Sequence, residues 1–350
     1  MKNKTFFKIN IIYFIAMILV ALIFILGYLG FLQNEYISSF LIQIMVMFAI
    51  PLLMYTMFIS KSFKQTFKDT GFKKISGRMI AIAIVLGIVL YFINNFVAQF
   101  FSSIISIFGY ENIGQTTTVT FSYELLFREF LLSCVLPGFC EEFLHRGIML
   151  HASKKCGNTR YVLISSSILF GLMHLNINQF FYAAILGFLM GYVSIVSDSI
   201  YPSIIIHFMN NFLNTYFYYG YYLNWPFATF INDLQALIMS NIFVFIIVNT
   251  LLMFMLIALY IYLTRVIAKE RVRYDVKKII SCLEINNLPI EEAQNKINQA
   301  NQILQKSESL KFKNTVSSGT RFSFLSQVFI ISSFILGGLI TISTFIWGII

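Results

Sequence analysis

Residues 123–150 read YELLFREFLLSCVLPGFCEEFLHRGIML, a stretch long enough to cross a bilayer as a helix that nevertheless contains six charged side chains. Charged groups at bilayer depth are costly, so they mark candidate functional sites. Glu124 and Arg128 are spaced to pair with each other near one end. Glu142 and Arg146 have the same spacing, which leaves Glu141 with no partner on its own helix face except His145.

The composition of the whole chain is that of a membrane protein. Of its 350 residues, 58% are hydrophobic and 11% are charged, against roughly a quarter charged in soluble domains. Such a chain has too little polar surface to cover a soluble globule and too much apolar volume for disorder. The four cysteines are scattered without a CxxC pair, which argues against a disulfide scaffold or a zinc finger.

The pattern of apolar runs predicts an all-α transmembrane helix bundle with eight or nine spans. The candidate spans are residues 6–32, 37–59, 79–108, 123–150, 161–177, 180–198, 200–219, 236–264 and 323–348. Alternate loops and the N-terminal segment hold 23 of the 25 Lys and Arg residues. Three come at the N-terminus, six between the second and third spans, three between the fourth and fifth, and eleven between the eighth and ninth. Under the positive-inside rule, this distribution predicts a cytoplasmic N-terminus and a multi-pass protein of the cell membrane.

Three regions follow from this pattern. Residues 1–264 form the predicted transmembrane bundle, 265–322 a cytoplasmic amphipathic helical segment, and 323–350 an additional C-terminal transmembrane helix. The middle region is either two short helices lying against the membrane or each other, or a module that binds a partner protein. The basic loops show no nucleic-acid recognition motif, so we expect the lipid bilayer and no nucleic acid as their partner.

Further polar groups lie in two other predicted spans. His174 is in 161–177, while His207 and Asn211 share one face of 200–219 because they are four residues apart. At 1.5 Å per residue, Glu141 and His174 are each about 20 Å from the basic loop between their spans. Four polar groups from three helices therefore converge on one layer of the membrane, and Pro137 and Gly138 are placed to kink the helix beside them.

These residues make a recognisable set. Glu141-Glu142-x-x-x-Arg146, Phe170-x-x-x-His174 and His207-x-x-x-Asn211 resemble the signature of the CPBP intramembrane proteases, the family of type II CAAX prenyl proteases and bacteriocin-processing (Abi) proteins. The resemblance covers about residues 120–220, the predicted protease core. His145 departs from the hydrophobic or aromatic residue usual at its position, and it lies within the variable part of the motif, where it is placed to modulate the site.

The resemblance implies a peptide-bond hydrolase. Glu141 and His174 would activate a water molecule, His207 and Asn211 would stabilise the oxyanion, and Glu142 and Arg146 would form a supporting ion pair. We expect no cofactor. Metal use nevertheless stays open, because Glu141, His174 and His207 would together supply three zinc ligands if a metal is bound.

The predicted substrate is a peptide or a membrane-associated protein rather than a prenylated one. Two other interpretations stay open: a catalytically silent membrane scaffold or immunity protein, and a proton-coupled transporter in which Glu and His relay protons. Cys140 is expected to be a packing residue, and His151 a plain residue of the membrane interface.

Overall fold

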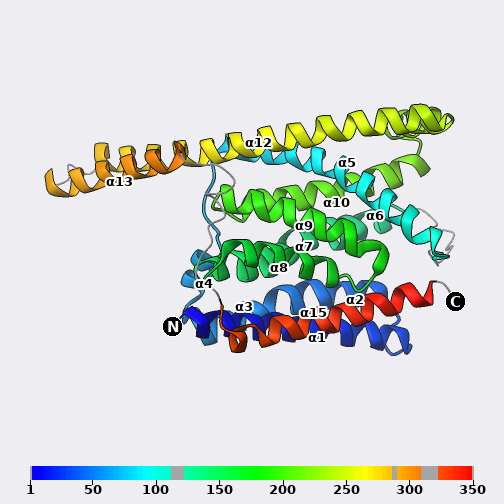
Figure 1. The fold of residues 1–350 in the computed structure, drawn as a ribbon, viewed down its shortest axis with the longest axis horizontal. Helices are drawn as coiled ribbons and strands as arrows, with labels where there is room; N and C mark the ends of the chain where they lie inside the picture. Colours follow the sequence, from blue (N-terminus) through cyan, green and yellow to red (C-terminus); the bar gives the residue numbers. More distant parts are fainter. Residues whose placement is uncertain (1, 112–121, 286–289, 309–321, 349–350) are drawn as a thin grey trace.

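The fold, seen in a computed structural model, is described over residues 2–111, 122–285, 290–308 and 322–348. Every element in these ranges is helical, which confirms the predicted all-α bundle (Figure 1). The α-helices are α1 (Lys2–Tyr28), α2 (Glu35–Phe40), α3 (Ile50–Tyr55), α4 (Phe63–Asp69), α5 (Gly77–Ile107), α6 (Tyr123–Glu129), α7 (Leu136–Glu142), α8 (Thr159–Leu172), α9 (Ile177–Val196), α10 (Tyr201–Tyr222), α11 (Pro226–Met239), α12 (Ile242–Ile285), α13 (Ile290–Glu308) and α15 (Phe324–Trp347).

Four π-helical segments interrupt the α-helices, and two of them flank the glutamate pair. They are η1 (Leu41–Ala49), η2 (Thr56–Ser60), η3 (Phe130–Val135) and η4 (Phe143–Ala152). The i to i+5 hydrogen bonds of π-helices are rare in proteins and are frequently found at functional sites. The segment that carries Glu141 and Glu142 is therefore the short α7, with a π-helical segment on each side.

Six helical segments are long and apolar enough to cross a membrane. They are Lys2–Tyr28, Glu35–Ser60, Gly77–Ile107, Ile177–Val196, Ile246–Ser281 and Phe324–Trp347. The predicted spans 123–150 and 200–219 are helical, and 161–177 is helical as far as Leu172, but none of the three is among the six. These three segments contain the charged and polar residues of the motif, and α8 has only 14 residues.

Most of the helices begin at a side chain that caps the exposed backbone N–H groups. Asn158 Oδ1 accepts hydrogen bonds from the backbone nitrogens of Arg160 and Tyr161 at the start of α8, and Asn176 caps α9 in the same way. Serines cap α4, α5, α6 and α15. Such caps stabilise a helix end by about 1 kcal/mol, and the Asn176 cap fixes the start of α9 just after His174.

Glycines let the helices around the polar motif approach one another closely. A Cβ atom on Gly87 of α5 would lie 2.5 Å from the Cβ of Met209 on α10. A Cβ on Gly138 of α7 would lie 3.2 Å from the backbone nitrogen of Phe208, also on α10. Small residues at such contacts are typical of packed membrane helices. They hold α10 against both α5 and α7, and so place His207 beside the glutamate pair.

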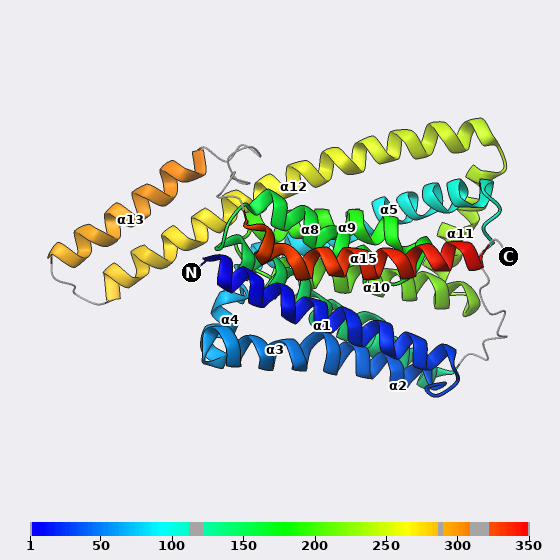
Figure 2. The same cartoon turned by 60° about the horizontal axis from the view of Figure 1, so that its bottom comes forward.

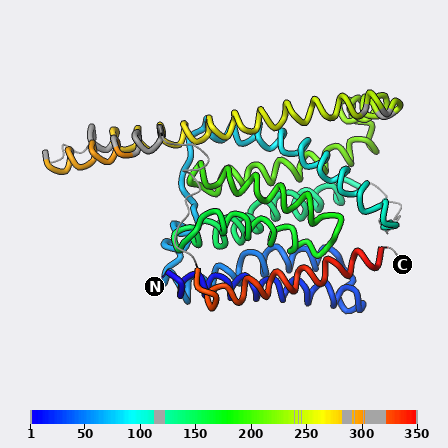
Figure 3. The backbone as a smooth tube through the Cα atoms, viewed as in Figure 1, coloured from blue at the N-terminus to red at the C-terminus, as the bar shows by residue number. Residues whose placement is uncertain are grey.

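The chain termini and the long helix α12 define the two ends of the bundle. The N-terminus lies at the same end as α4, and α15 ends at the opposite one (Figures 1 and 3). Helix α12 has 44 residues, about 66 Å of helix at 1.5 Å per residue, and it continues unbroken across residue 264. It projects beyond the bundle, and α13 folds back beside its projecting part (Figure 2).

Candidate active site

A cavity of about 390 Å³ contains all four predicted catalytic residues on its walls. Glu141 comes from α7, His174 from the turn after α8, and His207 and Asn211 from α10. The family signature therefore corresponds to one place in the fold, although its three parts are up to 70 residues apart along the chain. Glu124 and Arg128 form their expected ion pair on α6, outside this cavity.

A second cavity, of about 970 Å³, meets the first at Glu141 and His174. It is lined by α1, α2 and η1 and by the start of α9, and Gln179 is also common to both cavities. Glu141 and His174 are half-buried. The two predicted water-activating residues thus lie where the two cavities meet.

The sequence predicted that His174 lies within a membrane-spanning helix. In the structure it lies in a tight turn. Helix α8 ends at Leu172, and α9 starts at Ile177. The next residue, Leu175, is buried with φ +50°, an uncommon and strained conformation for a bulky residue that is found most often at functional sites. His174 Nδ1 lies 2.9 Å from the carbonyl oxygen of Phe170. Because a carbonyl only accepts, Nδ1 carries a proton, and Nε2 is the ring nitrogen that faces other partners.

Glu142, Arg146 and His207 form a buried charged cluster. Arg146 Nη1 donates to Glu142 Oε1 over 2.7 Å, as the i, i+4 spacing predicted, and the two side chains are 2% and 0% exposed. The same carboxylate oxygen lies 3.0 Å from His207 Nδ1, a contact that the sequence did not indicate. An ionised carboxylate accepts only, so Nδ1 of His207 carries a proton and Nε2 is the ring nitrogen that remains for another partner.

Phe170 is the common neighbour of these rings. Its centroid lies 5.2 Å from that of His174 and 5.7 Å from that of His207, both in edge-to-face geometry. The Arg146 guanidinium lies 4.3 Å from the same ring centroid, a cation–π contact. The aromatic residue of the F-x-x-x-H motif therefore fixes the orientation of both histidines and of the arginine.

The Asn211 amide is oriented by two hydrogen bonds. Its Nδ2 donates to the carbonyl oxygen of Ser133 over 2.8 Å, and its Oδ1 accepts from Asn210 Nδ2 over 3.0 Å. One N–H of the Asn211 side chain is then left for another acceptor. Asn210, which had no separate role in the sequence analysis, thus sets the orientation of Asn211 together with the Ser133 carbonyl.

The partner of Glu141 is a residue that the sequence analysis did not name. Gln43 Nε2, from η1, donates to Glu141 Oε1 over 2.7 Å. His145, the partner expected from spacing, instead lies with Nδ1 3.3 Å from the Tyr13 hydroxyl, and it is buried. A polar residue within the apolar stretch 40–54 was the available signal for Gln43, because amides at bilayer depth need a partner.

Side-chain amides dominate the polar lining of the smaller cavity. They belong to Asn94, Asn95, Gln179, Asn210, Asn211 and Asn214. The Oδ1 atoms of Asn94 and Asn210 are buried without a hydrogen-bond partner. Such unpaired acceptors are costly for the fold.

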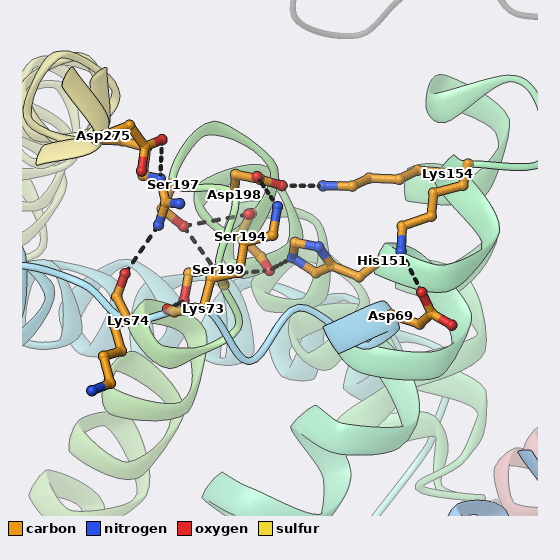
Figure 4. Close-up of polar contacts among 12 residues, drawn as sticks. Asp69, Lys73, Lys74, His151, Lys154, Ser194, Ser197, Asp198, Ser199 and Asp275 are labelled. Carbon is orange, nitrogen blue, oxygen red and sulfur yellow. Dashed lines mark hydrogen bonds and ion pairs between the residues drawn. The ribbon is translucent and has the colours of Figure 1, made fainter. Parts of the chain in front are cut away.

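His151 differs from the plain interfacial residue that was expected. It is buried, and its Nε2 lies 2.8 Å from Ser194 Oγ (Figure 4). Beside it Asp198, at the start of the α9–α10 loop, forms ion pairs with Lys73 and Lys154. This polar cluster lies at the end of the bundle where the chain enters α10. It joins that loop to the end of η4 and to the segment before α5.

The described side chains do not offer a ready-made metal site. No three His, Cys, Asp or Glu side chains within the described ranges converge closely enough to hold a metal ion. His207 Nδ1 is bonded to Glu142, and Glu141 Oε1 is bonded to Gln43. These bonds leave Nε2 of both His174 and His207 and the second oxygen of Glu141, so zinc binding by these three residues stays a prediction.

Comparison with known families agrees with this site. Residues 123–213 match the Rce1-like family, described as type II CAAX prenyl endopeptidase Rce1-like. No curated protein and no solved structure gives a significant match to the chain. The matched segment contains Glu141, His174, His207 and Asn211 together with the Glu142–Arg146 ion pair. Residues 123–213 of this membrane protein therefore match the CPBP/CAAX family of proteases that the sequence motif resembles.

Proposed function

We propose that the protein is an intramembrane endopeptidase of the cell membrane that hydrolyses peptide bonds with Glu141, His174, His207 and Asn211. One observation carries the proposal: these four residues, from three separate segments, line a single cavity inside a helical membrane bundle. The family match over the same residues supports the reaction class.

The first chemical step is activation of water. Glu141 acts as the general base, and His174 Nε2 accepts a hydrogen bond that helps to hold the water, since Nδ1 is bonded to the Phe170 carbonyl. The water oxygen attacks the scissile carbonyl carbon while its proton passes to the Glu141 carboxylate. The position of both residues at the junction of two cavities suits a substrate that extends to either side.

The second requirement is stabilisation of the oxyanion. The free N–H of the Asn211 amide is one donor, and His207 Nε2 is the other when the ring carries a proton on both nitrogens. Glu142 supports this role because its carboxylate is bonded to His207 Nδ1 and so orients the ring. The C–N bond then breaks, Glu141 returns its proton to the leaving nitrogen, and a carboxylic acid and an amine are released.

The proposed substrate is an extended peptide or a segment of a membrane protein. A peptide backbone offers N–H and C=O groups, which suit the side-chain amides that line the smaller cavity. We propose that hydrolysis uses these side chains alone and needs no metal. The region 265–322 is proposed as a contact for a protein partner rather than a part of the reaction.

Comparison of cells that produce either the wild type or Glu141→Ala tests this function. We expect peptides and membrane-protein fragments, identified by quantitative proteomics, to disappear in the variant while the protein still inserts. His174→Ala is the matched second variant. Identical peptide profiles for the wild type and both variants would contradict a protease and favour a silent scaffold.

A further inference from the structure

Helix residues 35–60 lie outside the segment that matches the protease family, yet they contribute a side chain to the Glu141 site. Gln43 Nε2 donates to Glu141 Oε1 over 2.7 Å, and Gln43 is 8% exposed. An amide donor to a carboxylate is a charge-assisted hydrogen bond, stronger than one between neutral groups. The contact joins residues 98 positions apart in the chain.

The packing around Gln43 fixes this contact. Gln43 lies in the π-helical segment η1, which packs against α7. Phe48 of η1 contacts Phe139 and Phe143, with ring centroids 5.2 and 5.0 Å apart. These two rings lie two residues before and two residues after Glu141. The aromatic contacts therefore set the register at which η1 presents Gln43 to the carboxylate.

Gln43 contacts Glu141 but lines neither of the two cavities that Glu141 lines. It therefore does not reach a substrate in either cavity. Its own Oε1 is buried without a hydrogen-bond partner, so the Glu141 contact is the one side-chain hydrogen bond that this amide makes within the described residues. Burial of an amide oxygen without a partner destabilises the fold. The Gln43 side chain bears this cost while its Nε2 bonds Glu141, which points to a role in the site.

We infer that Gln43 is a positioning residue for the proposed general base: its amide holds Oε1 of Glu141 and leaves Oε2 to meet the water. The inference rests on the proposed function. Glu has three rotatable side-chain bonds, and an unheld carboxylate at the junction of two cavities samples several orientations. Small displacements of a reacting group lower the catalytic rate by as much as about 10²-fold.

The test compares variants of the full-length protein reconstituted in liposomes. Gln43→Leu removes the donor at similar size, and Gln43→Glu keeps the shape but replaces the donor by a like-charged group. Gln65→Leu is the matched control, since Gln65 Nε2 also donates to a carboxylate, Asp69 Oδ1 at 2.9 Å, but at an exposed position. The probe is an internally quenched peptide built on the best-cleaved sequence of a proteome-derived peptide library.

Two readouts are compared. We expect kcat of Gln43→Leu and Gln43→Glu to fall about 10- to 100-fold with KM changed by less than about threefold, the pattern of a misplaced reacting group. The infrared carboxylate stretch of Glu141, assigned as the band lost in Glu141→Gln, should shift in Gln43→Leu. Gln65→Leu should match the wild type in both readouts.

An unshifted band, an unchanged kcat, or an effect on KM alone in a folded variant would overturn the inference. Gln43→Glu keeps the test decisive if Gln43→Leu fails to fold. Failure of the proposed function gives a different result: Glu141→Gln itself would then cleave the probe as fast as the wild type. In that case the positioning role also falls, even if the infrared band still reports the contact.

Discussion

Removal of the Arg146 guanidinium is the sharpest structural perturbation of the site. In Arg146→Met, the Glu142 carboxylate stays buried with no full positive charge at 2.7 Å, and the 3.2 Å hydrogen bond to the Gly187 carbonyl is also lost. Breaking a buried ion pair by removing one partner costs about 3–5 kcal/mol. A side-chain hydrogen bond between membrane helices contributes only about 0.6 kcal/mol on average. The loss of unfolding free energy expected for Arg146→Met is therefore several times larger than the loss of one such bond.

The assay is equilibrium unfolding of the purified protein in mixed micelles as the SDS fraction rises, followed by circular dichroism. The double variant Glu142→Gln with Arg146→Met removes both charges and keeps an acceptor for His207. We expect it to recover most of the loss, because no uncompensated charge remains. Two results would refute the reasoning that Glu142 and Arg146 form a desolvated ion pair. One is a loss of unfolding free energy below about 1 kcal/mol for Arg146→Met, and the other is a double variant as unstable as the single one.

Three further predictions follow from the packing, the polar cluster and the chemistry. Gly87→Ala should lower the melting temperature, because its Cβ would lie 2.5 Å from that of Met209, whereas Gly338→Ala, with no atom within 4 Å, should not. Burial opposes the charge of Asp198, but Lys154 and Lys73 hold its pKa below the usual value. The stability that Asp198 contributes is therefore present above about pH 4 and is lost below it, so Asp198→Asn should be destabilising at pH 7 and progressively less so below pH 4 in thermal melts. EDTA and 1,10-phenanthroline should leave the initial rate of peptide cleavage unchanged; loss of activity that zinc restores would contradict the metal-free proposal.

The sequence predicted the all-α membrane bundle and the residues that meet in the cavity. Helical spacing was sufficient for Glu142 and Arg146, because a pair four residues apart on one helix needs no knowledge of the tertiary structure. Equal depth in the bilayer was sufficient to place Glu141 and His174 at one level. These predictions depend on distances along single helices, which the chain fixes locally.

Contacts between helices were beyond such reasoning. The partner of Glu141 depends on how η1 packs against α7, and His145 was expected there only because it shares a helix face. The turn at His174 depends on a strained Leu175 that propensity does not predict. His151 was expected at an interface, but the close approach of the Gly71 backbone encloses its ring.

The central claim is that Glu141 activates the water that cleaves a peptide bond in the cavity. The most direct measurement is the single-turnover rate of cleavage of the quenched peptide by liposome-reconstituted wild type and Glu141→Gln. General-base catalysis predicts a fall of about 10²- to 10⁴-fold in a variant that remains folded. A folded Glu141→Gln protein that cleaves within twofold of the wild-type rate would contradict the account.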